Sequence, residues 1–223
     1  MNTLVVYLPP TEAETTLAYD YALSADGRTA SDHASVPPSL LPAAARGGEV
    51  VAVVPVTLLS WHSVDLPKGI GAGSARLRSV LEGLLEDRLL DDAAQMHLAL
   101  APAASASGGP IWVAACDKAW LRSHLLALEA AGRRVARVVP EFAPDIGPLR
   151  LHAISDANLP QLVVTGAGAE GVMRLPLTPA ALALVPTAAD AENILIFAEP
   201  AVAELAEQLL QRKVALATRL QRW

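Results

Sequence analysis

Apolar and polar positions along this 223-residue chain follow two different periods. Near the N-terminus, short apolar or alternating runs are separated by Pro9-Pro10 and by Asp26-Gly27, and the second dipeptide is a hairpin signal. These runs predict strands at residues 3–8, 17–23 and 28–35. The run EVVAVVP at 49–55 lacks alternation, which predicts a strand buried on both faces. A further strand is predicted at 58–67.

The strongest helical pattern lies at residues 74–90. Its apolar residues recur at helical spacing and form one broad face: Leu77, Val80, Leu81, Leu84, Leu85 and Leu89. Arg88 falls near the middle of this face, where it either extends its charge to solvent or pairs with a carboxylate. An acidic break at Asp91 and Asp92 ends the helix. The leucine face is expected to pack on the neighbouring strands.

Two strands, a helix and a third strand are predicted next. The strands lie at residues 95–101, 110–116 and 133–142, and the helix lies at 117–131. A Gly/Ser/Ala-rich loop at 102–109 joins the first two strands. Asp117 is expected to cap the N-terminus of the helix and Gly132 its C-terminus.

The pattern then repeats in part after a proline-rich connection at 141–149. Strands are predicted at 149–154, 161–165, 171–175 and 193–198, and helices at 179–184 and 200–211. Three strands, a helix, a strand and a helix thus occur twice, with an insertion in the first copy. This element order predicts a mixed α/β fold with two similar lobes, although no repeat is visible at the level of residues.

The composition fits a chain that buries a core of Ala, Leu and Val. Hydrophobic residues make up 52% of the sequence and aromatic residues only 4%. The net charge of −6 argues against a nucleic-acid partner, which would need a clustered basic face. The N-terminus does not resemble a signal peptide, and the best apolar window, residues 50–59, is too short to span a membrane. One cysteine excludes a disulfide framework and favours a reducing compartment.

Candidate catalytic groups do not gather into a site. Cys116 is interpreted as a small core residue, since a nucleophilic thiol would need a histidine such as His124 beside it. The five histidines have no metal-binding spacing, and neither GxSxG nor a P-loop occurs. We therefore expect no catalytic residue, no cofactor and no metal.

Gly166, Gly168 and Gly171 form a GxGxxG pattern after a predicted strand. A dinucleotide site would require a helix next, with its N-terminus facing the pyrophosphate. The following residues, VMRLPLTP, are typical of a strand. The glycines are therefore expected to form a hairpin turn, where they supply positive φ angles.

Charged residues on the predicted helix at 74–90 give two alternatives. Glu82 and Glu86 are four residues apart, and such a like-charged pair costs roughly 0.2–0.5 kcal/mol. In the structural interpretation, Arg78 relieves the repulsion. In the functional one, Arg78, Glu82 and Glu86 with the acidic turn at Asp91 and Asp92 form a docking stripe for a basic partner.

Residues 77–100, LRSVLEGLLEDRLLDDAAQMHLAL, resemble the segment by which the type II secretion system protein L family is recognised. In that family, an arginine-bearing helix leads into a Leu-Glu-Asp-x-Leu motif, an acidic stretch and a histidine-bearing strand. The corresponding residues here are Leu85, Glu86, Asp87, Leu89, Asp91, Asp92 and His97. Residues 50–67 resemble the two strands before that helix, and 139–142 resemble a second family stretch.

The resemblance implies an actin-like arrangement of two RNase H-like lobes, which agrees with the repeated element order. The first lobe is expected at 1–145, with an inserted α/β subdomain at about 56–132, and the second at 146–223. Family members continue into one transmembrane helix and a periplasmic domain. The chain is therefore expected to be the cytoplasmic part of a single-pass protein, at the cytoplasmic face of the bacterial inner membrane.

The resemblance also implies a non-enzymatic scaffold of the secretion platform. Such a scaffold recruits the secretion ATPase, protein E, through the N-terminal region of that ATPase, and couples it to the membrane complex. Protein M is the implied membrane partner of the full-length chain, and a homodimer is a further expectation. Contact with the membrane is expected only through the transmembrane helix.

The alternative is an actin-like nucleotide-binding protein, as in the related pilus-assembly proteins. Actin-like ATPases carry an acidic or glycine-rich phosphate loop after their first strand. Here that position reads YLPPTEAE, residues 7–14. Pro9 and Pro10 lack the backbone N–H groups that would bind a phosphate, which argues against this alternative.

Overall fold

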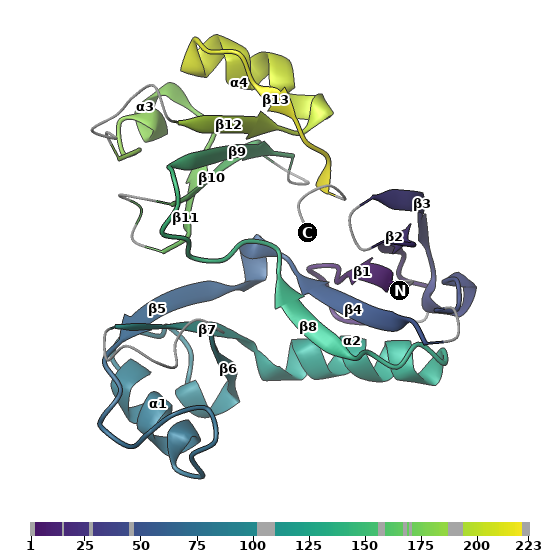
Figure 1. Cartoon of the computed structure of the whole chain (residues 1–223), viewed down its shortest axis with the longest axis vertical. Coiled ribbons are helices and arrows are strands. Elements are labelled where there is room, and N and C mark those ends of the chain that lie inside the picture. The colour runs from purple at the N-terminus through teal and green to yellow at the C-terminus, as the bar shows by residue number, and fades with distance from the viewer. Residues whose placement is uncertain are drawn as a thin grey trace. The chain divides into compact units, whose positions relative to one another are not determined.

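The computed structural model describes residues 3–14, 16–26, 29–44, 47–101, 110–155, 159–166, 169, 171–186 and 194–219. Contacts divide the chain into two compact units, Met1–Pro140 and Glu141–Trp223. Their elements are labelled in Figure 1.

A five-stranded sheet forms the centre of the first unit. Its strands are β1 (Thr3–Tyr7), β2 (Tyr19–Ser24), β3 (Ala30–Val36), β4 (Glu49–Val54) and β8 (Arg137–Pro140), in the order β3-β2-β1-β4-β8. β1, β2 and β3 form an antiparallel meander, whereas β4 pairs with both β1 and β8 in parallel. Five of the six residues of β4 are buried, which confirms the strand predicted to be buried on both faces.

One face of this sheet is covered by α2 (Lys118–Ala130). Trp120, Leu121 and Leu128 on the helix share a core with Leu4 and Ala52 on the sheet. The carboxylate of Asp117 accepts from the amide of Trp120 at 2.6 Å, which confirms the predicted N-cap.

The C-cap of α2 is Ala131, one residue before the predicted Gly132. Gly132 follows it with φ +74°. The amide of Arg133 donates to Leu128 O at 2.8 Å, and that of Gly132 to Glu129 O at 2.9 Å. These two bonds form a Schellman motif, which needs a residue with positive φ at this position. The motif also explains why β8 begins only at Arg137, later than the predicted start at residue 133.

Between β4 and α2 the chain forms a small antiparallel sheet with its own helix. The elements are β5 (Ser60–Val64), α1 (Leu77–Leu85), β6 (Met96–Leu100) and β7 (Ile111–Asp117), and the strand order is β5-β7-β6. Leu81 and Leu85 of α1 pack on Val64 and Val113, so this part of the leucine face packs on the strands as expected. Leu84 was predicted on the same face but is exposed. The loop predicted at 102–109 lies outside the described residues.

α1 has nine residues, and the helix predicted over 74–90 is therefore too long. At its start, Arg76 occupies the N-cap without a capping side chain. At its end, the amides of Arg88 and Leu89 both donate to the carbonyl of Leu85, at 2.9 and 3.0 Å. The bond from Arg88 has i→i−3 spacing, which tightens the end of the helix, and residues 86–88 form a turn.

The second unit contains a sheet with the same topology. Its elements are β9 (Arg150–Ile154), β10 (Gln161–Thr165), β11 (Met173–Pro176), α3 (Pro179–Leu182), β12 (Leu195–Ala198), α4 (Ala203–Leu210) and β13 (Ala215–Leu216). The strand order is β11-β10-β9-β12-β13, and β13, at the edge, was not predicted. The helix predicted from Pro200 begins as a 3₁₀ turn over Pro200–Val202 and continues as α4. Two antiparallel pairings are followed by two parallel ones, as in the first sheet. This confirms the two similar mixed α/β lobes.

Candidate docking surface

The turn that follows α1 exposes carboxylates and leucines together. Glu86, Asp87 and Asp91 are exposed, Leu90 among them is fully exposed, and 37% of Leu84 on α1 is exposed. An exposed leucine beside several carboxylates suits a partner segment that combines apolar and basic side chains. Leu84, Glu86, Asp87, Leu90 and Asp91 together form the acidic turn surface.

Arg78 connects α1 to the segment beyond this turn. Its Nε lies 2.5 Å from Glu82 Oε1, which is the contact that the structural interpretation of this pair requires. The guanidinium also donates to the carbonyl oxygens of Ala93, Ala94 and Met96, at 2.9, 3.2 and 2.7 Å. Two of the predicted docking residues, Arg78 and Glu82, therefore already interact with each other within the chain.

Two further contacts fix the turn. Arg88, which is exposed, donates from Nη1 to the carbonyl oxygen of Ser63 at 2.6 Å, so its charge extends from the helix end toward solvent. Asp92 accepts from the amide of Ala94 at 2.9 Å and caps a 3₁₀ turn at Ala93–Gln95. The turn is thus held at its start by Arg88 and at its end by Arg78 and Asp92.

The predicted docking residues therefore differ in their availability. Glu86 and Asp91 are exposed and form no ion pair with another described residue. Sequence reasoning missed Leu84, Asp87 and Leu90. The signal for Leu90 was present, because on a helical wheel it falls far from the face of Leu81 and Leu85.

The connection between β1 and β2, where an actin-like ATPase would bind a phosphate, is held against α2. Three contacts hold it: Trp120 Nε1 to Pro9 O at 3.1 Å, His124 Nε2 to Thr11 O at 2.9 Å, and the amide of Ala13 to Ser123 Oγ at 3.4 Å. Two carbonyl oxygens and one amide of this connection thus bond to the helix, and its two prolines supply no N–H.

His124 is fully buried and has a defined tautomer. Because the carbonyl of Thr11 can only accept, Nε2 carries the proton, and Nδ1 accepts from the hydroxyl of Tyr19 at 2.6 Å. Burial lowers the pKa of His124, so the ring is neutral at pH 7. Burial likewise raises the pKa of Tyr19 to about 12.

Cys116 is a buried core residue, as expected from the sequence. Burial, with a smaller contribution from Asp117, raises the pKa of its thiol to about 11. Both ring nitrogens of His124 bond to other groups. A thiol with so high a pKa is protonated at neutral pH and is a poor nucleophile.

The glycines of the GxGxxG pattern lie between β10 and β11, which form an antiparallel hairpin. Gly166 has φ +96° and Gly171 has φ +91°, whereas Gly168 lies outside the described residues. The element that follows them is β11, a strand. This confirms the hairpin interpretation of the pattern.

The second unit contains a pocket of about 310 Å³ on the face of the sheet that carries His152. His152 stacks on Phe197, with ring centroids 4.9 Å apart, and meets Phe142 edge-on at 5.0 Å. The charged residues that line the pocket are in ion pairs: Arg150 pairs with Asp145, and Glu141 pairs with Arg219. Such a lining offers aromatic surface and little net charge.

Two further features concern the described residues as a whole. No group of three or more His, Cys, Asp or Glu residues in these ranges could hold a metal ion. Within the same ranges, no helix combines the length and apolar character needed to cross a membrane.

Two lobes with the strand order 3-2-1-4-5, each with three antiparallel strands followed by two parallel ones, define a protein of the actin-like class, built from RNase H-like lobes. A family model for type II secretion system (T2SS) protein L matches residues 25–146, more than half of the chain. The chain belongs to this family, and it is thus a component of a type II secretion system.

Two solved structures have a similar fold. The cytoplasmic domain of EpsL, an inner-membrane component of the type II secretion system of Vibrio cholerae, is 21% identical with a TM-score of 0.62, over 100% of this chain and 88% of that one. A PilM-PilN type IV pilus biogenesis complex is 14% identical with a TM-score of 0.62, over 99% of this chain and 89% of that one. No curated protein matches the chain.

Proposed function

We propose that this protein is a non-enzymatic scaffold of the secretion platform at the cytoplasmic face of the inner membrane. It recruits the secretion ATPase, protein E, through that ATPase's N-terminal region and couples it to the membrane complex, with protein M as its membrane partner. The acidic turn surface is the candidate contact with the ATPase. The observation that supports it is the bracing of this turn by Arg78 and Arg88.

The bracing matters because an ordered surface loses less conformational entropy when a partner binds. Each side chain or loop residue that must be immobilised costs affinity, and a turn already held by hydrogen bonds avoids part of that cost. Leu90 offers apolar area to bury, and Glu86 and Asp91 offer charge that steers a basic segment toward it.

Reversing the charge of Glu86 and Asp91 tests this proposal without disturbing the bracing. The double variant Glu86→Lys, Asp91→Lys should weaken binding to the cognate ATPase by about tenfold, because two attractions become repulsions. A pull-down and a titration by calorimetry would measure the loss. Glu82 is left intact, since its replacement would release Arg78.

The matched control reverses the same charge elsewhere in the first unit. Glu12 and Glu14 are exposed in the connection after β1, so Glu12→Lys, Glu14→Lys makes an equal change in net charge. Its affinity should stay within about twofold of the wild type. Equal losses in both double variants would mean a non-specific charge effect, and no loss in either would exclude the acidic turn surface.

Nucleotide binding separates this scaffold from an actin-like nucleotide-binding protein. Calorimetry with ATP and magnesium should give no binding heat, because Pro9 and Pro10 supply no amide to a phosphate and the amide of Ala13 is bonded to Ser123. A saturable heat with ATP would contradict the scaffold-only proposal, and the pocket beside His152 would then be the first site to mutate.

A further inference from the structure

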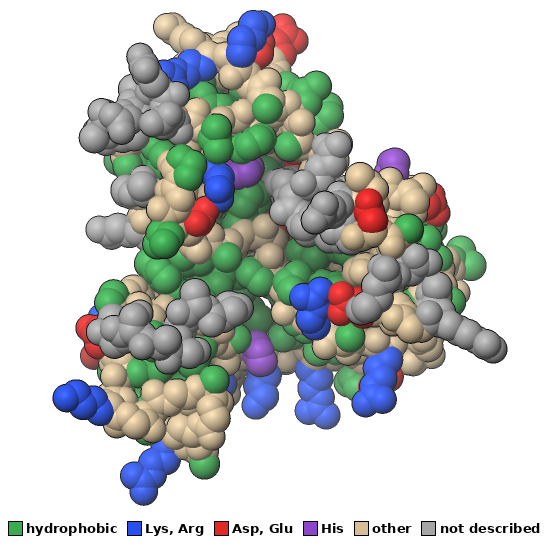
Figure 2. Space-filling view, in the orientation of Figure 1, with side chains coloured by type: hydrophobic (Ala, Val, Ile, Leu, Met, Phe, Trp, Pro, Cys, Tyr) green, Lys and Arg blue, Asp and Glu red, His purple; other side chains and the backbone are tan. Residues whose placement is uncertain are grey.

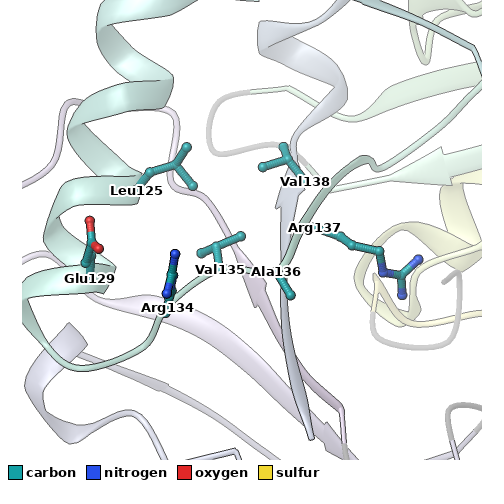
Figure 3. Close-up of a pocket in the computed structure, with 7 residues that line it drawn as sticks. All are labelled: Leu125, Glu129, Arg134, Val135, Ala136, Arg137 and Val138. Atoms are coloured by element: carbon teal, nitrogen blue, oxygen red, sulfur yellow. The ribbon is translucent and has the colours of Figure 1, made fainter. Parts of the chain in front are cut away.

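A groove of about 320 Å³ lies between the C-terminal half of α2 and the edge strand β8. In Figure 3, Leu125 extends from α2 toward β8, and Val138 extends from β8 toward α2, with Val135 near them. Arg137 points to the other side of the strand, where it pairs with Glu49 at 2.7 Å. The groove therefore has an apolar floor.

Among the described residues, no strand pairs with the outer side of β8. β8 pairs with β4 and lies at the edge of the described sheet. The amide of Ala136 donates to the carbonyl of Val50 at 2.8 Å. Since backbone groups alternate in direction along a strand, those of Arg137 and Val139 point away from β4, toward the open edge. The side chain of Val138 beside them is 40% exposed.

The border of the groove is basic. Arg134 lines the groove, and Arg122 lies one turn before Leu125 on the same face of α2. Both are exposed, and no ion pair joins either of them to another described residue. Figure 2 shows Lys and Arg side chains gathered along the edge of the molecule over α2. Among the residues that line the groove, Glu129 is the one carboxylate. This basic border stands out in a chain whose net charge is −6.

The walls of the groove are fixed before any partner arrives. The Schellman motif at Gly132 sets the path from α2 into β8. The guanidinium of Arg133 donates to the carbonyl of Leu41, which connects this turn to the segment that follows β3. A preformed groove loses less entropy on binding.

We propose that this groove binds an acidic, extended segment of a partner protein, which adds a strand to the sheet at β8 and places an apolar side chain between Leu125 and Val138. Main-chain hydrogen bonds to an open strand edge supply affinity in this binding mode, and the neighbouring pocket and charges supply specificity. The groove is distinct from the acidic turn surface and selects the opposite charge, so this inference does not depend on the proposed function.

The positive charge along the groove argues against a second copy of the chain as the segment that binds there. If β8 paired with β8 of another copy, two basic borders would face each other and repel. The strand edge and the apolar floor also favour a peptide over an anionic lipid surface, because lipid headgroups would use only the positive charge. Both occupants are measurable outcomes of the test.

The test is selection from a random peptide library displayed on phage against the folded chain, with the variant Arg122→Glu, Val138→Lys used to remove unrelated binders. Acidic sequences with alternating apolar residues should be enriched. A synthetic copy of the best one should bind the double variant at least about tenfold more weakly. Methylating alternate amides of that peptide should also weaken binding, because it removes strand pairing.

The control variant carries the same two types of change at exposed positions away from the groove, Arg76→Glu with Leu159→Lys. It should bind the peptide within about twofold of the wild type. Four results would overturn the proposal: no enrichment, enrichment of basic peptides, a dimer in light scattering that Val138→Lys dissolves, or groove-dependent binding to anionic vesicles without peptide binding.

Discussion

Replacing Gly166 with alanine should destabilise the protein by about 3 kcal/mol or more. A Cβ at this position would lie 2.1 Å from the carbonyl oxygen of Pro148, far inside van der Waals contact. The φ angle of +96° adds strain for any residue with a side chain. Backbone atoms rather than a flexible side chain make the clash, so the hairpin between β10 and β11 must move. Urea unfolding followed by circular dichroism would measure the loss.

Gly83 provides the matched control for this substitution. It lies inside α1, and a Cβ added there would meet no atom within 4 Å. Gly83→Ala should stabilise the protein by about 0.5–1 kcal/mol, since alanine loses less entropy in a helix. Similar changes in stability for Gly166→Ala and Gly83→Ala would contradict the close approach to Pro148.

Replacing His124 with alanine should cost about 3 kcal/mol or more at pH 7. The substitution empties a fully buried site and leaves the hydroxyl of Tyr19 and the carbonyl of Thr11 without their partner. It also releases one contact that holds the connection after β1 against α2. His33→Ala is the control, because His33 is exposed on β3 and should change stability by less than about 0.5 kcal/mol.

The cost of losing His124 should depend on pH. Burial lowers its pKa in the folded protein below the ordinary value of 6.5. As the pH falls from 7 toward 5, the unfolded chain therefore binds a proton before the folded protein does, and the stability that neutral His124 contributes is lost. The stability difference between wild type and His124→Ala should shrink over this range. A constant or growing difference would contradict a neutral, buried ring.

Local patterns in the sequence were sufficient to predict most of the helices and strands. Asp117 caps α2 because its side chain bonds an amide three residues away, which sequence spacing alone predicts. The buried strand β4 and the glycine hairpin were likewise predicted from neighbouring residues. The helix predicted over 74–90 was wrong in length, because its end depends on the i→i−3 bond from Arg88 to Leu85 and on the contact of Arg88 with Ser63 on another strand.

The docking surfaces were less accessible to sequence reasoning. Arg78 and Glu82 carried the pattern of an exposed stripe, yet Arg78 bonds carbonyls 15 to 18 residues away. Leu90 was missed because helical spacing indicates a buried face more clearly than an exposed one, and Leu84 was wrongly assigned to the buried face. The groove beside β8 could not be predicted from the sequence, since it forms between a helix and a strand whose own patterns do not show that they lie side by side.

The sequence by itself determined the order of elements, the two similar lobes and the family, because each rests on residues close together along the chain. Only the tertiary structure decided which charges are free. Hydrogen bonds over long sequence separations engage Arg78, Arg133 and His124, whereas Arg122 and Glu86 remain exposed. Availability to a partner depends on such distant contacts, and these form only when the chain has folded.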